Sequence, residues 1–249
     1  MLLYKYFPPT TNSFKSLINA GVWCDNYSNM NDPFECLANV SRLYDENQIK
    51  DFKSKALKSI EPRWRLMAEL RDEVIVEFIK NFRQEFIKNS YYFGSLSENN
   101  DDILLWSHYA ASHTGFVLAI NFDETDNHIQ KVAYQDTLPD YDNEWYFKLK
   151  DEDEENSASV SYLLKDFAIK STNWSYEKEW KVSRKNRGYF RFKPEDVKAI
   201  YFGLNCNADI EKVFVTLLSY TDDDVPVYKM ALSTNPFMII AKDYEFPEK

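Results

Sequence analysis

The sequence predicts one α+β domain. Short segments rich in aliphatic and aromatic residues, typical of strands, recur along the 249-residue chain, and one long stretch at 46–90 has helical periodicity. Hydrophobic residues make up 44 % of the chain, which is sufficient for a core, and neither an internal repeat nor a low-complexity linker divides it. We therefore expect residues 1–249 to form a single domain that carries 46–90 as a helical insertion.

The first forty residues are expected to contain a strand, a short helix and an ordered turn. Leu2–Phe7 is strand-like, and Thr11 or Asn12 is placed to cap a helix that Gly21 ends. The run Asn-Asp-Pro-Phe-Glu at 31–35 predicts a turn. Proline disfavours helix at the residue before it, and Asn and Asp bond to nearby backbone groups.

The remaining elements follow from hydrophobic periodicity. In 46–90 apolar residues recur every three or four positions, which is typical of an amphipathic helix packed on the body, and Pro62 is expected to break it. The charge run at 151–155 is typical of a solvated loop or a helix start. Further strands are predicted at 91–97, 116–120, 180–183, 199–202, 225–230 and 237–241, and further helices at 103–112, at 162–169 and from Asn207 or Asp209 to Leu218.

Composition excludes several kinds of site. The chain has five glycines, and the closest two, Gly188 and Gly203, lie fifteen positions apart. The sequence therefore contains neither a Walker phosphate loop nor a G-x-G-x-x-G dinucleotide turn. Three widely spaced cysteines and three histidines predict no disulfide framework and no histidine-rich metal centre.

Charge and hydropathy limit the partners. The formal net charge of −10 argues against a broad nucleic-acid-binding surface, although it leaves room for a small basic patch. No apolar run approaches the length of a membrane span, and the N-terminus does not resemble a signal peptide. The sequence thus predicts a cytoplasmic protein with no membrane contact.

Two of four polar clusters lie near the N-terminus. Tyr4-Lys5-Tyr6 is on the opening strand, where alternation places Lys5 on the face opposite the two tyrosines. These residues fit either the edge of a core or a ring that stacks on a base or ribose beside a cation for phosphate. The turn at 31–35 is either a self-bonded turn or a binding loop.

The third cluster surrounds two histidines near the helix at 103–112. His108 and His113 are five positions apart, a rotation of about 140° on a helix, which makes them a poor pair of ligands for one metal ion. Each fits either a structural histidine or a ligand-binding one. We expect His113 past the helix end, where it bonds free carbonyls or meets a substrate.

The fourth cluster contains Glu177 and Glu179. If a strand begins near Glu177, both carboxylates point to one face and Lys178 to the other. Two carboxylates on one face, between bulky aromatic residues, raise the pKa of one of them by repulsion and desolvation. The alternative is a pair of edge-strand charges neutralised by Lys181 or Arg184.

Taken in order, the clusters resemble the bacterial domain-of-unknown-function family 2971. The likeness runs from the first strand to about Gly203. It is carried by Tyr-Lys-Tyr at 4–6, Asn-Asp-Pro-Phe-Glu at 31–35, Trp-Ser-His-Tyr at 106–109 with His113 and Gly115, and Trp-x-Tyr-Glu-x-Glu-Trp at 174–180. The chain departs from the pattern at 93–97, where a Cys-Phe-Ser-like strand is expected, and at Lys181, where arginine is usual.

A looser resemblance bears on function. An aromatic and cationic strand, a short helix, a serine-bearing strand and E-x-E opening a strand follow one another as in ADP-ribosyltransferases. That fold is a split, mainly antiparallel α+β sheet that holds NAD without a glycine-rich loop. The resemblance implies that Lys5, with Tyr4 or Tyr6, takes the first-motif position, and that Ser95 or Ser97 takes the second.

The same resemblance assigns the glutamates. It implies that Glu179 bonds the nicotinamide ribose and stabilises an oxocarbenium-like transition state, and that Glu177 orients or deprotonates the acceptor. No metal ligand is predicted. The predicted site comprises Glu177 and Glu179 as catalytic residues and, as ligand-binding residues, Tyr4, Lys5, Tyr6, Ser97, Trp106, His108, Tyr109 and His113.

The sequence therefore predicts an ADP-ribosyltransferase-like protein that uses NAD as substrate, a toxin-like effector in bacterial phage defence with a protein partner or antitoxin. The alternative is a non-catalytic module that binds a nucleotide or a protein, because this chain has Tyr-Lys-Tyr where those enzymes favour His or Arg. A third hypothesis is a metal-dependent nuclease or phosphoesterase that uses Asp32, Glu35, His108 and Glu179, since oxygen ligands with one imidazole suit Mg or Mn.

Overall fold

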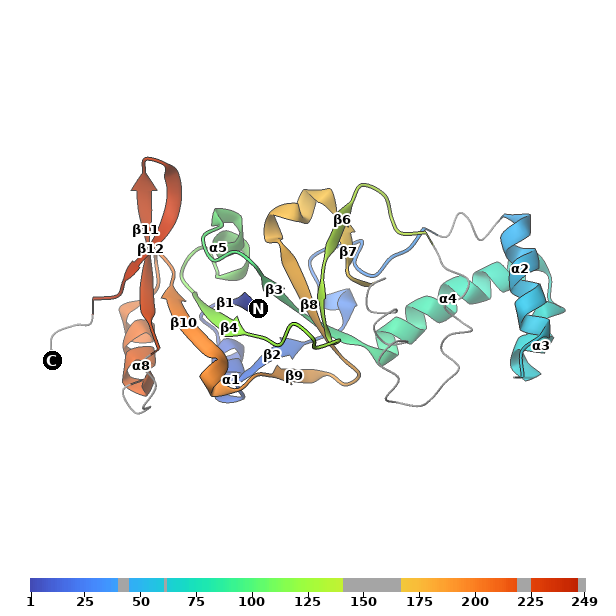
Figure 1. Cartoon of the computed structure of the whole chain (residues 1–249), viewed down its shortest axis with the longest axis horizontal. Coiled ribbons are helices and arrows are strands. Elements are labelled where there is room, and N and C mark those ends of the chain that lie inside the picture. Colours follow the sequence, from blue (N-terminus) through green and yellow to red (C-terminus); the bar gives the residue numbers. More distant parts are fainter. Residues whose placement is uncertain (40–44, 61, 141–166, 219–224, 246–249) are drawn as a thin grey trace.

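A large, mainly antiparallel sheet organises the chain (Figure 1). The structure, a computed structural model, describes residues 1–39, 45–60, 62–140, 167–218 and 225–245. Within them eight strands form one sheet in the order β12-β11-β10-β4-β1-β3-β8-β5, and only β10 and β11 pair in parallel. The strands are β1 (Leu2–Phe7), β3 (Tyr92–Ser97), β4 (Phe116–Asn121), β5 (Ile129–Lys131), β8 (Glu179–Arg184), β10 (Val197–Phe202), β11 (Val227–Thr234) and β12 (Phe237–Asp243). The predicted combination of helices with a mainly antiparallel sheet is confirmed.

Smaller elements cover the two faces of this sheet. In Figure 1, α1, β2 and β9 lie below its central strands, and α5 lies above them. β2 and β9 pair antiparallel, and β6 and β7 pair in parallel. The bounds are α1 (Thr11–Ile18), β2 (Gly21–Cys24), η1 (Tyr27–Asn29), α5 (Ile103–Tyr109), β6 (Ala133–Gln135), β7 (Ile169–Ser171), η3 (Thr172–Glu177), β9 (Gly188–Arg191), η4 (Pro194–Asp196) and α8 (Ala208–Leu218), where η denotes a 3-10 helix.

Alternation along the strands separates two cores. On β1, Leu3 and Phe7 pack into the core beneath the sheet, whereas Tyr4 and Tyr6 belong to a second core with α5. β4 is buried on both faces from Phe116 to Ile120, because Phe116, Leu118 and Ile120 pack in the first core and Val117 and Ala119 in the second. Burial on both faces explains its continuous apolar sequence.

The predicted helical insertion is an arm of three helices. α2 (Glu46–Leu57) and α3 (Pro62–Ala68) lie at the far end of α4 (Asp72–Ser90), which extends away from the sheet in Figure 1. Pro62 opens α3, where its missing N–H is not needed, and a further break precedes α4. The arm has its own core around Trp64, which Phe78 and Phe82 meet edge-on.

Helix ends differ from the sequence-based expectation. Thr10, rather than Thr11 or Asn12, caps α1, and Ala20 rather than Gly21 takes the left-handed conformation after it (φ 44°). The helix predicted to end at Ser112 ends at Tyr109, because residues 111–113 all have left-handed φ values. Of the helix predicted at 162–169, Phe167 to Ile169 is described, and Ile169 begins β7; the rest, like the charge run at 151–155, lies outside the described residues.

No helix within the described residues combines the length and the apolar character that a membrane crossing requires.

Gly115 fixes how closely the turn after α5 approaches β1. A Cβ atom at this position would lie 2.0 Å from the carbonyl oxygen of Phe7. We expect Gly115→Ala to lower the free energy of unfolding by about 2 kcal/mol or more, because the backbone of β1 has to move. Urea unfolding followed by circular dichroism measures this. Leu232→Ala, at a residue 71 % exposed, is the control, and equal stability of the two variants would contradict the prediction.

Candidate functional site

A cleft opens where the central sheet divides. β1 pairs with β4 along its whole length, and β3 pairs likewise with β8, but within the described residues β1 and β3 pair at one position, Tyr4 with Ser97. Farther along β3, Asp25, the residue after β2, bridges Phe93 through backbone hydrogen bonds. The space bounded by β1, β3 and β2 is a cleft of about 730 Å³.

Three residues predicted for the site form one row across this sheet. Tyr4 of β1 lies opposite Ser97 of β3, and Ser97 lies opposite Glu179 of β8. Residues directly opposite one another in an antiparallel ladder point to the same face. All three line the cleft, so the sheet brings together side chains that are up to 175 positions apart (179 − 4).

Lys170 holds the two glutamates together. Its Nζ donates to Glu177 Oε2 at 2.7 Å and to Glu179 Oε2 at 2.8 Å. All three side chains are at least 95 % buried. Burial works to lower the pKa of Lys170, but the carboxylates of Glu179 and Glu177 outweigh it and raise that pKa above its ordinary value. Lys170 therefore keeps its proton at neutral pH.

The convergence of the glutamates has a different cause from the predicted one. The strand begins at Glu179, not near Glu177, which ends the 3-10 helix η3. Lys178 between them is left-handed (φ 41°), and this local turn directs both carboxylates to Lys170. The alternative of edge-strand charges paired with Lys181 or Arg184 is wrong for these residues.

Tyr109 completes the setting of Glu177. Its hydroxyl donates to Glu177 Oε1 and accepts a 2.7 Å bond from Asn31 Nδ2. Burial and the Glu177 carboxylate raise the pKa of Tyr109, so the phenol keeps its proton. Burial also raises the pKa of Glu177, although Lys170 opposes the shift. Both oxygens of Glu177 are thus bonded.

Glu179 differs because one of its oxygens is not bonded. Glu179 Oε1 is buried and has no hydrogen-bond partner among the described residues, although the side chain lines the cleft. The Tyr134 hydroxyl fixes the backbone by accepting from Glu179 N at 2.7 Å. A buried carboxylate oxygen without a donor is costly, and a hydroxyl of a bound molecule would satisfy it.

Lys5 lies where β1 and β3 separate. Its Nζ donates to the carbonyl oxygen of Ser95 at 2.9 Å and so occupies a backbone acceptor of β3 beside the split. Burial lowers the pKa of Lys5, while its interactions with Cys24 and Glu179 oppose that shift. As predicted from alternation, Lys5 is on the face opposite Tyr4 and Tyr6, whose rings pack with α5.

Only part of the cluster around the two histidines lies at the cleft. His108 and Tyr109 line the cleft, as does Tyr6, but Trp106 and His113 do not. Trp106 is fully buried, and His113 stacks on it with ring planes 7° apart. The structure therefore brings eight of the ten predicted site residues to the cleft and gives Trp106 and His113 a structural setting behind α5.

The 31–35 turn supports the site from outside the cleft. Asp32 Oδ1 accepts from the backbone of Phe34 at 2.9 Å, which is the self-bonded turn that the sequence indicated. Glu35 is buried and forms an ion pair with Lys181 of β8. Asn31 reaches Tyr109, so the turn is tied both to α5 and to the strand of Glu179.

Sequence reasoning missed Lys170, Tyr134, Trp23 and Arg187. Lys170 and Tyr134 lie on β7 and β6, strands of three residues that are too short for a pattern of alternation. Trp23 is one of many aromatic residues in the sequence, and no motif distinguishes it from the others. Of the four residues of the metal-dependent hypothesis, His108 and Glu179 line the cleft, whereas Asp32 and Glu35 do not, and among the residues described no three His, Cys, Asp or Glu side chains are grouped as a metal ion would require.

Comparison with known proteins gives one match. A protein-family model with the description "Protein of unknown function (DUF2971)" matches residues 105–182, from α5 to β8. The match includes both glutamates and Lys170, and it supports the resemblance drawn from the ordered motifs. No curated protein and no solved structure matches the chain.

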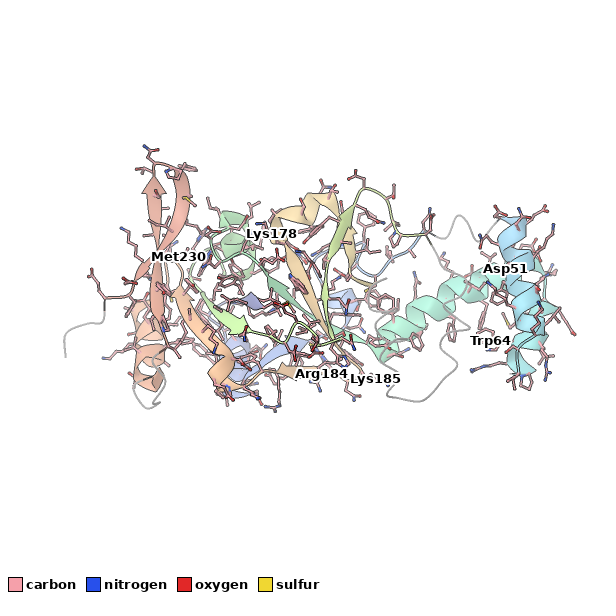
Figure 2. All side chains as sticks on the ribbon, in the orientation of Figure 1. Asp51, Trp64, Lys178, Arg184, Lys185 and Met230 are labelled. Atoms are coloured by element: carbon pink, nitrogen blue, oxygen red, sulfur yellow. The ribbon has the colours of Figure 1, made fainter. Side chains whose placement is uncertain are left out.

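Removing Lys170 tests whether one cation holds the site. We expect Lys170→Met to lower the free energy of unfolding by about 3–5 kcal/mol, because two carboxylates are left buried without a counter-charge. Urea denaturation at neutral pH measures the loss. The control is Lys178→Met, at the exposed lysine between the two glutamates in the sequence, which is labelled in Figure 2. It should change the free energy of unfolding by about 0.5 kcal/mol or less. A loss below about 1 kcal/mol in Lys170→Met would contradict this account.

His113 gives the fold a pH dependence of known sign. Burial lowers its pKa below the ordinary 6.5, so the unfolded chain binds a proton more readily than the folded one. The stability contribution of neutral His113 is present above pH 6.5 and is lost as the pH falls through its folded pKa. We expect His113→Asn, which suits the left-handed φ of 66°, to lose less stability between pH 7.5 and about 5 than the natural chain does. Parallel stability profiles would contradict the assignment.

Proposed function

We propose that the chain is an NAD-consuming enzyme of the ADP-ribosyltransferase type that binds NAD in the cleft between β1 and β3. The observation that carries the proposal is the row of Tyr4, Ser97 and Glu179 on three adjacent strands. These are the three segments whose order along the chain resembles ADP-ribosyltransferases. Their alignment in one cleft is what a shared substrate site needs.

The size and lining of the cleft support a nucleotide ligand. A volume of about 730 Å³ lies within the range of roughly 300–1,000 Å³ typical of small-molecule sites. The lining combines tyrosines, hydroxyl groups, three carboxylates and lysine ammonium groups. Such side chains take the place of the glycine-rich loop that the sequence lacks.

Glu179 is assigned the electrostatic role. Lys170 donates a hydrogen bond to its Oε2. This leaves Oε1 to accept a hydrogen bond from a hydroxyl of the nicotinamide ribose. In the reaction, the bond between ribose C1′ and the nicotinamide nitrogen breaks, and its electron pair leaves with nicotinamide. The fixed carboxylate of Glu179 stabilises the positive charge that develops on the ribose. Water or a side-chain nucleophile then forms the new bond to C1′ and loses a proton.

Glu177 is assigned the acceptor side of the reaction. Its two oxygens are bonded to Tyr109 and Lys170, so the carboxylate has one fixed orientation toward the cleft. Because burial raises its pKa, Glu177 is a stronger proton acceptor than an exposed glutamate. It therefore orients the acceptor and receives its proton.

The alternative is a binding module that retains the cleft without turnover. Two observations favour it: one lysine is paired with both glutamates, and the Lys5 ammonium donates to the carbonyl oxygen of Ser95. In this case NAD or a related nucleotide binds, but the bond to nicotinamide persists.

Substitution of Glu179 distinguishes the two functions. We expect the purified natural chain to release nicotinamide from labelled NAD, and Glu179→Gln to lower that rate about 100-fold or more, since the amide cannot stabilise the developing charge. The measurement is nicotinamide release by chromatography together with transfer of label to protein. Glu98→Gln, which alters an ion pair with Lys131 outside the cleft, should retain the rate. Binding of NAD without turnover in the natural chain would establish the module instead.

A further inference from the structure

The cleft has a second end, which the proposed chemistry does not use. Trp23 of β2 and Tyr189 of β9 lie directly opposite each other across their ladder, with ring centroids 5.0 Å apart and planes at 70°. Both line the cleft. Trp23 points away from the core, since its neighbours Val22 and Cys24 are fully buried while Trp23 is 41 % exposed. We call Lys15, Trp23, Arg187 and Tyr189 the Trp23 end.

The ring of Trp23 is held in place. Its indole N–H donates to Asp25 Oδ2 at 3.4 Å, and the Arg187 guanidinium lies 5.5 Å from the ring centroid. Arg187 also donates to Asp25 Oδ2 at 2.8 Å. Partial burial works to raise the pKa of Asp25, but the bonds from Arg187 and the Asn26 backbone outweigh it and lower that pKa. Trp23 therefore has a fixed orientation with an arginine beside its ring.

The same end carries positive charge, although the chain as a whole is acidic. Asp25 balances Arg187, but the exposed Lys15 of α1 has neither an ion pair nor a hydrogen bond through its ammonium to any residue described here. Lys5 lies between the two ends and is bonded to a neutral carbonyl. At the glutamate end, by contrast, the one ammonium of Lys170 is shared by two carboxylates, and the formal charge of these three side chains is negative. An anionic group is thus favoured at the Trp23 end.

The distance between the ends suits a molecule with two parts. Asp25 pairs with Phe93, and Glu179 pairs with Ser97, four residues farther along β3. At roughly 3.3 Å per residue, the two rows are about 13 Å apart along the strand. A ligand whose ribose meets Glu179 therefore extends a second group toward Trp23.

We propose that the Trp23 end binds a nucleoside monophosphate group, with the base on the Trp23 ring and the phosphate between Lys15 and Arg187. This inference rests on the proposed function for the identity of the whole ligand as a dinucleotide. Its own basis is the held, exposed indole beside Arg187, in a cleft that Lys15 also lines. The Trp23–Tyr189 pair could serve only to stabilise the sheet, as cross-strand aromatic pairs do. That role would need neither a cleft beside the pair nor a lysine without a partner, whereas binding of a nucleotide uses both.

Binding of AMP and GMP, measured by isothermal titration calorimetry, tests this site separately from turnover. We expect at least one of them to bind the natural chain, and Trp23→Leu to weaken that binding about tenfold, while Trp23→Phe retains most of it. Arg187→Gln should weaken binding of the nucleotide by a similar factor and weaken binding of the corresponding nucleoside less, since the nucleoside lacks the phosphate. Lys185→Gln is the matched control, because Lys185 lies on the same turn, labelled in Figure 2, but does not line the cleft.

The outcomes separate the two proposals. AMP or GMP binding that depends on Trp23 and Arg187 and survives Glu179→Gln supports the Trp23 end, even if NAD is never turned over. Absence of binding by both nucleotides to the folded natural chain would overturn it. Equal binding by Trp23→Leu, Arg187→Gln and Lys185→Gln would also overturn it, whatever the result of the NAD assay.

Discussion

The ammonium of Lys170 between two buried carboxylates is the interaction on which the candidate site depends. Glu177 and Glu179 are both removed from water, and two such carboxylates cannot both stay ionised without a counter-charge. Lys170 supplies that charge from β7, and each glutamate offers it one oxygen. The remaining oxygen of Glu177 attaches α5 through Tyr109, and Asn31 attaches the 31–35 turn to the same hydroxyl. One cation thereby connects motifs that are distant in the sequence.

The division of the sheet is the second constraint. Where β1 leaves β3, the edge of β3 is shared between the Lys5 ammonium at Ser95 and the backbone of Asp25 at Phe93. These contacts pair backbone groups of β3 with other partners where the two strands stay apart. The scarce glycines serve packing instead, since Gly115 and Gly203 allow backbone segments to touch. Side chains are therefore the groups left to hold a ligand, as the missing glycine loops indicated.

Much of the sheet could be predicted because its long strands carry local signals. β1, β3, β4, β8 and β10 follow apolar patterns of six residues, and they bring most of the predicted site residues together. The left-handed Lys178 could not be foreseen, since lysine gives no sign of such a backbone, and the expected strand start was wrong for that reason. Lys170 was hidden because its three-residue strand is defined by pairing with β6, a contact between distant residues. The packing of His113 on Trp106 could not be predicted either. Three successive left-handed residues fold His113 back on Trp106, and no periodicity records that turn.

The ion pairs bear directly on whether Glu179 can act in catalysis. A counter-charge weakens the field of a carboxylate, which at first sight favours a binding module. In a buried site, however, a glutamate without a nearby cation takes up a proton and has no field at all. Lys170 supplies such a cation and binds Oε2 of Glu179, while Oε1 has no hydrogen-bond partner among the described residues. The Tyr134 hydroxyl holds the backbone of Glu179, which limits reorganisation when charge develops nearby. The cation is thus a condition for electrostatic catalysis by Glu179, and its presence does not argue against the enzyme.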